Sequence, residues 1–93
     1  MIELGGGIFL DNFENIESGK LIIVKKIVGN YTKNISGKIE EFNKITISVN
    51  EENGYKINVN VKANKEFSAD GEKENLFFAL NDALDGITKQ IDQ

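Results

Sequence analysis

The sequence predicts an α+β domain with the element order β-α-β-β-β-α, in which a four-stranded, mostly antiparallel sheet carries two helices packed on one face. Apolar and polar residues alternate over residues 44–69, which is typical of strands with one buried face. Apolar residues recur at intervals of three and four in residues 17–36 and 72–91, which is typical of amphipathic helices. A chain of 93 residues has the length of one domain, so we expect residues 1–93 to form a single domain.

The first expected strand covers residues 2–10, where Ile2, Leu4, Ile8 and Leu10 alternate with other residues. The run of three glycines at residues 5–7 interrupts this pattern, and we expect it to mark a bulge or a close approach of the backbone. The run lacks the spacing of the known phosphate-binding fingerprints, so a phosphate-binding loop is disfavoured here.

Residues 17–36 carry two competing signals. Leu21, Val24, Val28, Tyr31 and Ile35 would share one helical face. Residues 20–28 are nevertheless rich in β-branched side chains, which favour strands. The periodicity extends over four turns, so we expect a helix that stops at Gly37, although a strand over residues 20–28 would change the topology.

Residues 44–69 predict a three-stranded meander, because Asn53-Gly54 is a strong hairpin signal between two alternating segments. A second helix is expected over residues 72–91. Asp70 is its expected cap, and Glu72 and Glu74 suit the positive end of the helix dipole. Its apolar stripe consists of Leu76, Leu80, Ala83, Leu84, Ile87 and Ile91.

The composition argues against catalysis. The sequence has no His, which is the commonest general base and the commonest metal ligand. It also has no Cys, so a thiolate nucleophile and a Cys-based metal site are excluded. We therefore expect a non-enzymatic binding domain without a metal or cofactor, and no small-molecule substrate is evident. Apolar runs reach at most five residues, as in residues 76–80, and no secretion signal is apparent, so a cytoplasmic protein without a membrane partner is expected.

Charge is distributed unevenly along the chain, whose net charge is −4. Residues 20–38 carry five lysines and no acid, whereas residues 66–93 carry seven acids and two lysines. Lys25, Lys26 and Lys33 lie on or beside the polar face of the first helix. They form either a solvated face or a surface that contacts RNA phosphates. All 11 basic residues are lysines, so bidentate recognition of bases by arginine is excluded.

Three large apolar residues fall outside the stripes of the two helices. They are Ile22 and Ile23 in the first helix and Phe78 in the second. Phe78 either packs against the edge of the neighbouring helix or contacts a partner from an exposed position. The three residues are therefore candidates for a protein interface, with self-association as one form of it.

The stretch of residues 65–84 resembles the last strand and last helix of the ribosome hibernation-promoting factors, a family that includes ribosome-associated inhibitor A and protein Y. It runs from a strand ending at Ala69, through acidic residues, into a helix containing Phe78-Ala79-Leu80 and Asp82. Residues 45–61 match the preceding hairpin. The resemblance implies a single-domain protein that binds the small ribosomal subunit near the decoding site and silences translation.

The second helix departs from that family, because the region carries only Lys73 and Lys89 against several acids, and this face would repel RNA. The double-stranded-RNA-binding domain shares the order of the last five elements. However, it needs a basic start to its final helix, where this chain has Glu72-Lys73-Glu74. An acidic protein–protein interaction module is therefore the favoured function. The alternative is a ribosome- or RNA-associated protein of hibernation-factor type that uses Lys25, Lys26 and Lys33.

Overall fold

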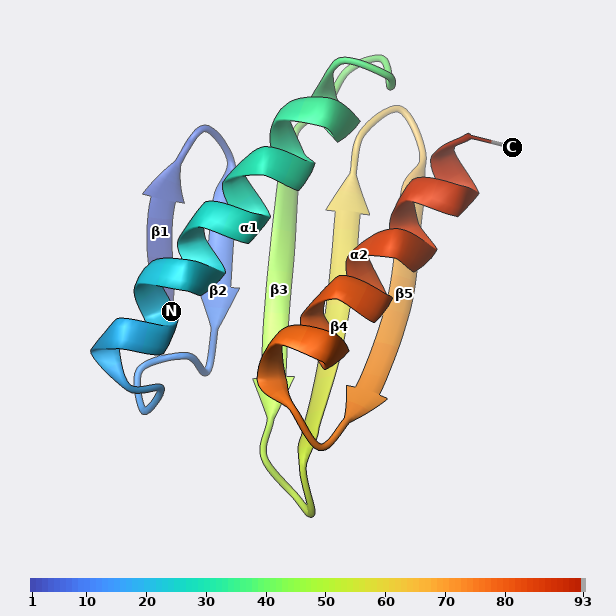
Figure 1. The fold of residues 1–93 in the computed structure, drawn as a ribbon. Helices are drawn as coiled ribbons and strands as arrows, with labels where there is room; N and C mark the ends of the chain where they lie inside the picture. The colour runs from blue at the N-terminus through green and yellow to red at the C-terminus, as the bar shows by residue number, and fades with distance from the viewer. Residues whose placement is uncertain (93) are drawn as a thin grey trace.

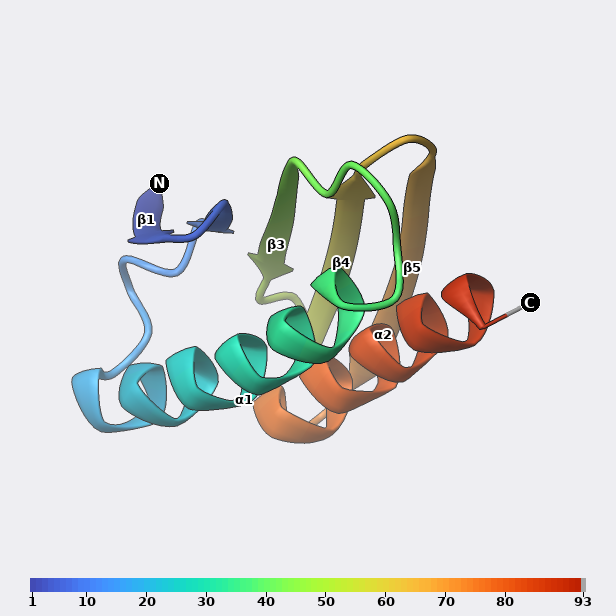
Figure 2. The same ribbon diagram turned by 90° about the horizontal axis from the view of Figure 1, so that it is seen from above.

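The computed structural model describes residues 1–92 and has two layers, a five-stranded mixed sheet and two helices that cover one of its faces (Figures 1 and 2). The elements in chain order are β1 (Ile2–Gly5), β2 (Ile8–Asp11), α1 (Ser18–Ser36), β3 (Lys44–Asn50), β4 (Tyr55–Lys62), β5 (Glu66–Lys73) and α2 (Leu76–Ile91). The strands lie in chain order, and only β2 and β3 pair in parallel. The α+β class is confirmed, with five strands in place of the expected four.

The additional strand arises from the glycine run, because the chain reverses at residues 5–7 and forms a β1–β2 hairpin. Gly5, Gly6 and Gly7 all have positive φ, at 86°, 61° and 81°. Only glycine adopts this left-handed backbone region at low cost at three consecutive positions. The expected single strand over residues 2–10 is therefore wrong. The expected close approach does occur, since a Cβ on Gly7 would lie 2.6 Å from the Asn43 carbonyl oxygen.

Residues 20–28 are helical, so the periodicity of the sequence outweighs its β-branched residues. Val24, Val28 and Ile35 are buried beneath α1, and Leu21 and Tyr31 are partly buried. The helix ends at Gly37 as expected. Gly37 has a φ of −78°, so the helix stops without a left-handed residue.

The expected three-stranded meander forms as β3, β4 and β5, in which Ile47 lies opposite Val59 and Val59 lies opposite Ala69. Asn53 and Gly54 form its first turn with φ values of 55° and 118°. The apolar rows of β3 and β4 face the helices and are buried, and the opposite face of the sheet is polar.

The start of α2 differs from the expectation. β5 continues to Lys73, so Asp70 and Glu72 are strand residues on the open face of the sheet. The helix is capped by Asn75, whose Oδ1 accepts hydrogen bonds from the backbone N–H groups of Phe77 and Phe78 at 2.9 and 3.2 Å. An asparagine at this position satisfies two of the amide donors that every helix N-terminus leaves free.

Helix α2 lies very close to β5, and a buried glycine makes this possible. A Cβ on Gly71 would lie 2.2 Å from the Ala79 carbonyl oxygen and 2.8 Å from the Ala83 nitrogen. Ala79 and Ala83 are themselves small and fully buried. Each side of the contact therefore presents a residue with little or no side chain, and the helix backbone approaches the strand directly.

The core extends from this contact across the whole space between the layers. It includes Phe13 and Ile16 from the loop that connects β2 to α1, and Phe13 has no exposed surface. The loop is held by a 2.8 Å hydrogen bond from Asn12 Nδ2 to the Val49 carbonyl oxygen. Within residues 1–92, no helix has the length and apolarity needed to cross a membrane.

Candidate functional site

The two helices run side by side in the same direction across the sheet (Figure 1). Two side-chain contacts fix their relative position. The Tyr31 hydroxyl donates to Asp85 Oδ1 at 2.7 Å, and Lys38 Nζ lies 3.2 Å from Asp92 Oδ1. Both contacts join residues that are 54 positions apart in the chain. Residues of α1 and α2 with that separation are therefore at the same height in the layer, which places Phe78 level with Val24.

The apolar patch, which we define as Ile22, Ile23 and Phe78, lies at the N-terminal end of this helical layer. The exposed fractions of the three residues are 66%, 47% and 65%. Phe78 does not pack into the edge of the neighbouring helix, so that alternative for it is wrong. The patch is supplied by the second turn of α1 and the first turn of α2, and the parallel arrangement brings these turns to one end of the helical layer.

Lys25, Lys26 and Lys33 are all exposed on α1, and none of them forms an ion pair within residues 1–92. Lys26 and Lys33 are seven residues apart and share the outermost line of the helix with Ile22. We call Ile22, Lys26 and Lys33 the outer line of α1. Lys25 lies on the flank of the helix.

Helix α2 carries two carboxylates on its outermost line, which ends at Lys89, four residues after Asp85. Phe78, Asp82 and Asp85 follow one another at intervals of four and three residues, so they project from the same side of the helix. All three are exposed. We call them, together with Lys89, the outer line of α2. The layer therefore presents two lysines on one line next to two carboxylates on the other. Each line begins with a large apolar side chain, and the α2 line ends with Lys89.

The contact between Tyr31 and Asp85 links α1 to the outer line of α2. The hydrogen bond to the Asp85 carboxylate raises the pKa of the Tyr31 hydroxyl to about 12, with smaller contributions from partial burial and from the carboxylate charge. This hydroxyl donates only while it is protonated. The contact therefore stabilises the folded protein fully at pH values below the ordinary tyrosine pKa of about 10. Its contribution is lost as the pH rises from about 10 through the folded-state value.

We expect Asp85→Asn to lower the pKa of Tyr31 from about 12 toward the ordinary tyrosine value, because the charged acceptor is removed. The measurement is a near-ultraviolet absorbance titration of tyrosinate in a Tyr55→Phe background, so that Tyr31 is the only tyrosine observed. Asp82→Asn is the matched control and should leave the titration unchanged. Identical titrations of Asp85→Asn and the Tyr55→Phe parent would contradict the hydrogen bond.

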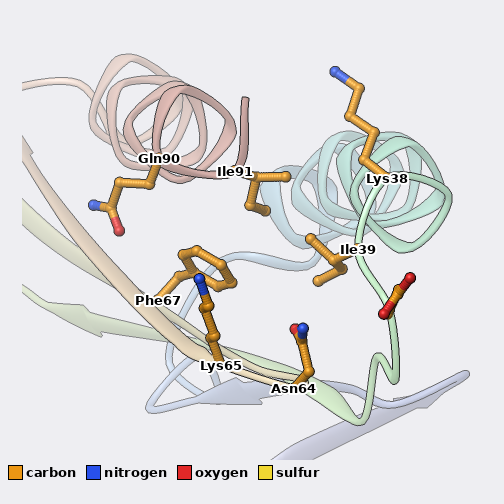
Figure 3. A pocket seen from close by; sticks show the side chains of 8 residues that line it. Lys38, Ile39, Asn64, Lys65, Phe67, Gln90 and Ile91 are labelled. Carbon is orange, nitrogen blue, oxygen red and sulfur yellow. The ribbon is translucent and has the colours of Figure 1, made fainter. Parts of the chain in front are cut away.

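A hollow of about 330 Å³ lies between the C-terminal ends of the helices and the β4–β5 turn (Figure 3). Ile39, Phe67 and Ile91 point toward one another there, whereas Lys38 points away. Two of the polar side chains at its rim have partners, since Lys38 pairs with Asp92 and Gln90 Nε2 donates to the Ser68 carbonyl oxygen at 2.6 Å. Glu40, Asn64 and Lys65 also line the hollow, and their side chains form no hydrogen bond or ion pair within residues 1–92.

The open face of the sheet is polar, and several of its side chains form hydrogen bonds with one another. Asn58 Nδ2 donates to Asp70 Oδ1 at 2.7 Å, and Asn60 Nδ2 donates to Glu66 Oε2 at 3.1 Å. Lys44 Nζ lies 5.8 Å from the centre of the Phe9 ring. Among residues 1–92, no group of three or more His, Cys, Asp or Glu is arranged to hold a metal ion.

No known protein-family model matches this sequence, and no curated protein is similar enough to count as a relative. The outer face of the helical layer therefore stands as the candidate functional site on its own geometry. The sequence patterns had indicated each apolar and basic member of this face. They had not indicated that the apolar members lie at one end, because the register between the helices depends on the Tyr31–Asp85 and Lys38–Asp92 contacts.

Proposed function

We propose that this protein is a non-enzymatic protein-binding module whose contact surface is the outer face of the helical layer. The observation that carries the proposal is the apolar patch, in which three large side chains are exposed at one end of a small domain. Scattered exposed apolar residues are normal, but a group of them rimmed by charges is typical of a protein interface. Aromatic side chains such as Phe78 are enriched in such interfaces.

The charges on the same face support a protein partner more than a nucleic acid. Asp82 and Asp85 lie on the helix beside Lys26 and Lys33, so a polyanion approaching the lysines would also meet carboxylates. Adjacent lysines and carboxylates suit a partner surface that itself carries both signs of charge, since complementary charges favour one orientation of the complex.

A second candidate function is ribosome or RNA association of hibernation-factor type. The order β2-α1-β3-β4-β5-α2 is compatible with the resemblance, and the free amines of Lys25, Lys26 and Lys33 favour contact with phosphates. In this case co-sedimentation with ribosomes should occur at low salt and should fall steeply as the salt concentration rises.

Photocrosslinking in cells separates the two candidates. A photoreactive amino acid at position 78 is expected to form adducts with protein, whereas the same amino acid at position 72, on the open face of the sheet, should form few. Equal yields of protein adducts at the two positions would refute the proposed interface. Adducts with RNA alone, together with salt-sensitive co-sedimentation, would favour the second candidate instead.

A further inference from the structure

Resting on the proposed function, we infer that the partner is a second copy of this chain, with the outer faces of the two helical layers in contact and α1 of each copy on α2 of the other. The two-fold axis of this dimer runs parallel to the helices. The inference depends on three features of the described residues, which are the charge of the two outer lines, the register between the helices and the charge of the free sheet edge.

The two-fold symmetry of a homodimer leaves few ways to place one helical layer face to face on another. An axis across the helices would place α1 on α1 and α2 on α2, so Lys26 and Lys33 would face the lysines of the second copy and Asp82 and Asp85 would face its carboxylates. An axis along the helices places α1 on α2 at both contacts, so Lys26 and Lys33 of each copy meet the helix that carries Asp82 and Asp85. Opposed like charges are unfavourable, and this selects the second arrangement.

The register between the helices supports the same arrangement. Rotation about an axis parallel to the helices leaves the position of each residue along the helix axis unchanged. A residue of α1 therefore faces the residue of the other copy's α2 that lies 54 positions further along the chain. Ile22 then lies within two positions of Phe78, and Lys26 within two positions of Asp82. Lys33 lies between Asp85 and Lys89, so the pair of Lys26 and Asp82 carries the charge argument. Two positions correspond to about 3 Å along a helix, which side chains of this length span easily.

The β5 edge of the sheet gives no equally favourable route to a dimer. β5 is an outermost strand with a free edge, and Glu66, Asp70 and Glu72 project from it on the open face of the sheet. Pairing of β5 with itself would bring these carboxylates together across the new strand pair, and like charges opposed in this way are destabilising. Charged side chains on an edge strand are a common protection against such pairing.

The inference is tested by sedimentation velocity of the purified chain over a range of concentrations. The unaltered protein should form a dimer as its concentration rises. Lys26→Glu and Asp82→Lys should each weaken the dimer by about tenfold, because each substitution replaces two attractive contacts by two repulsive ones. Lys25→Glu makes the same charge change on the flank of the same helix and should leave the dimer constant unchanged.

The decisive sample is an equal mixture of the Lys26→Glu and Asp82→Lys proteins. In the mixed dimer both contacts again join opposite charges, so dimer formation should return to the level of the unaltered protein. The chain that carries both substitutions should recover it as well. Failure of the mixture to recover, or an equal effect of Lys25→Glu, would overturn the proposed arrangement.

A chain that stays monomeric at every concentration would overturn the second copy as partner. It would leave the protein-binding function to the crosslinking experiment, since adducts at position 78 with a different protein would still support that function. Failure of both experiments would remove the outer face as a protein interface altogether.

Discussion

Replacing Gly71 by alanine should lower the free energy of unfolding by about 3 kcal/mol, at the upper end of the usual cost of overpacking a core. The added methyl group would lie 2.2 Å from the Ala79 carbonyl oxygen and 2.8 Å from the Ala83 nitrogen. Both are backbone atoms of α2, so no side-chain rotation can relieve the overlap. The helix would have to move away from β5, and the core beneath it would lose packing.

Denaturant-induced unfolding measures this effect, and Gly29→Ala is the matched control. Gly29 lies within α1 and has no atom within 4 Å of the position that a Cβ would occupy. The same substitution there should raise the free energy of unfolding by about 0.5–1 kcal/mol, because alanine loses less backbone entropy in a helix than glycine. A cost below about 1 kcal/mol for Gly71→Ala would show that α2 does not rest on the strand as described.

The regular elements could be predicted from the sequence because their periodicities are long. Residues 17–36 keep one apolar face over four turns, and residues 45–61 alternate around an Asn-Gly turn. Both features depend on neighbours that are close in the chain, and local geometry decides them.

The boundaries depended instead on contacts that the sequence pattern does not reveal. Residues 70–73 have no strong strand character, yet they pair with β4, and α2 packs over Gly71 in this segment. The strand therefore extends past the expected cap at Asp70, and the cap moves to Asn75. The sequence pattern predicts that the three consecutive glycines distort a single strand. Their positive φ values instead allow a complete reversal of the chain.

The candidate site could be predicted residue by residue but not as a surface. Ile22, Ile23 and Phe78 are recognisable because they fall outside apolar stripes. Their common location requires the helices to be parallel with a separation of 54 residues, which follows from the parallel pairing of β2 with β3 and from two long-range side-chain contacts.

Phe13 is the buried aromatic residue that periodicity could not find, because it lies in a loop and belongs to no repeating pattern. Its side chain has no exposed surface and joins the single core cluster. The loop keeps its shape through the hydrogen bond of Asn12 to the Val49 carbonyl oxygen and through the bond from the Ile16 N–H group to the Phe13 carbonyl oxygen at 3.1 Å. The loop therefore anchors the β2–α1 connection to the core.

We expect Phe13→Ala to lower the free energy of unfolding by about 3–5 kcal/mol, since it removes a fully buried aromatic ring and leaves a cavity. Phe78→Ala makes the same chemical change at a residue that is 65% exposed, and it should alter stability by no more than about 0.5 kcal/mol. Both are measured by denaturant-induced unfolding at concentrations where the chain is monomeric. Similar costs at the two positions would contradict either the anchoring of the loop or the exposure of the apolar patch. A large difference, together with weaker dimerisation of Phe78→Ala alone, would separate a side chain that holds the fold together from one that is available to a partner.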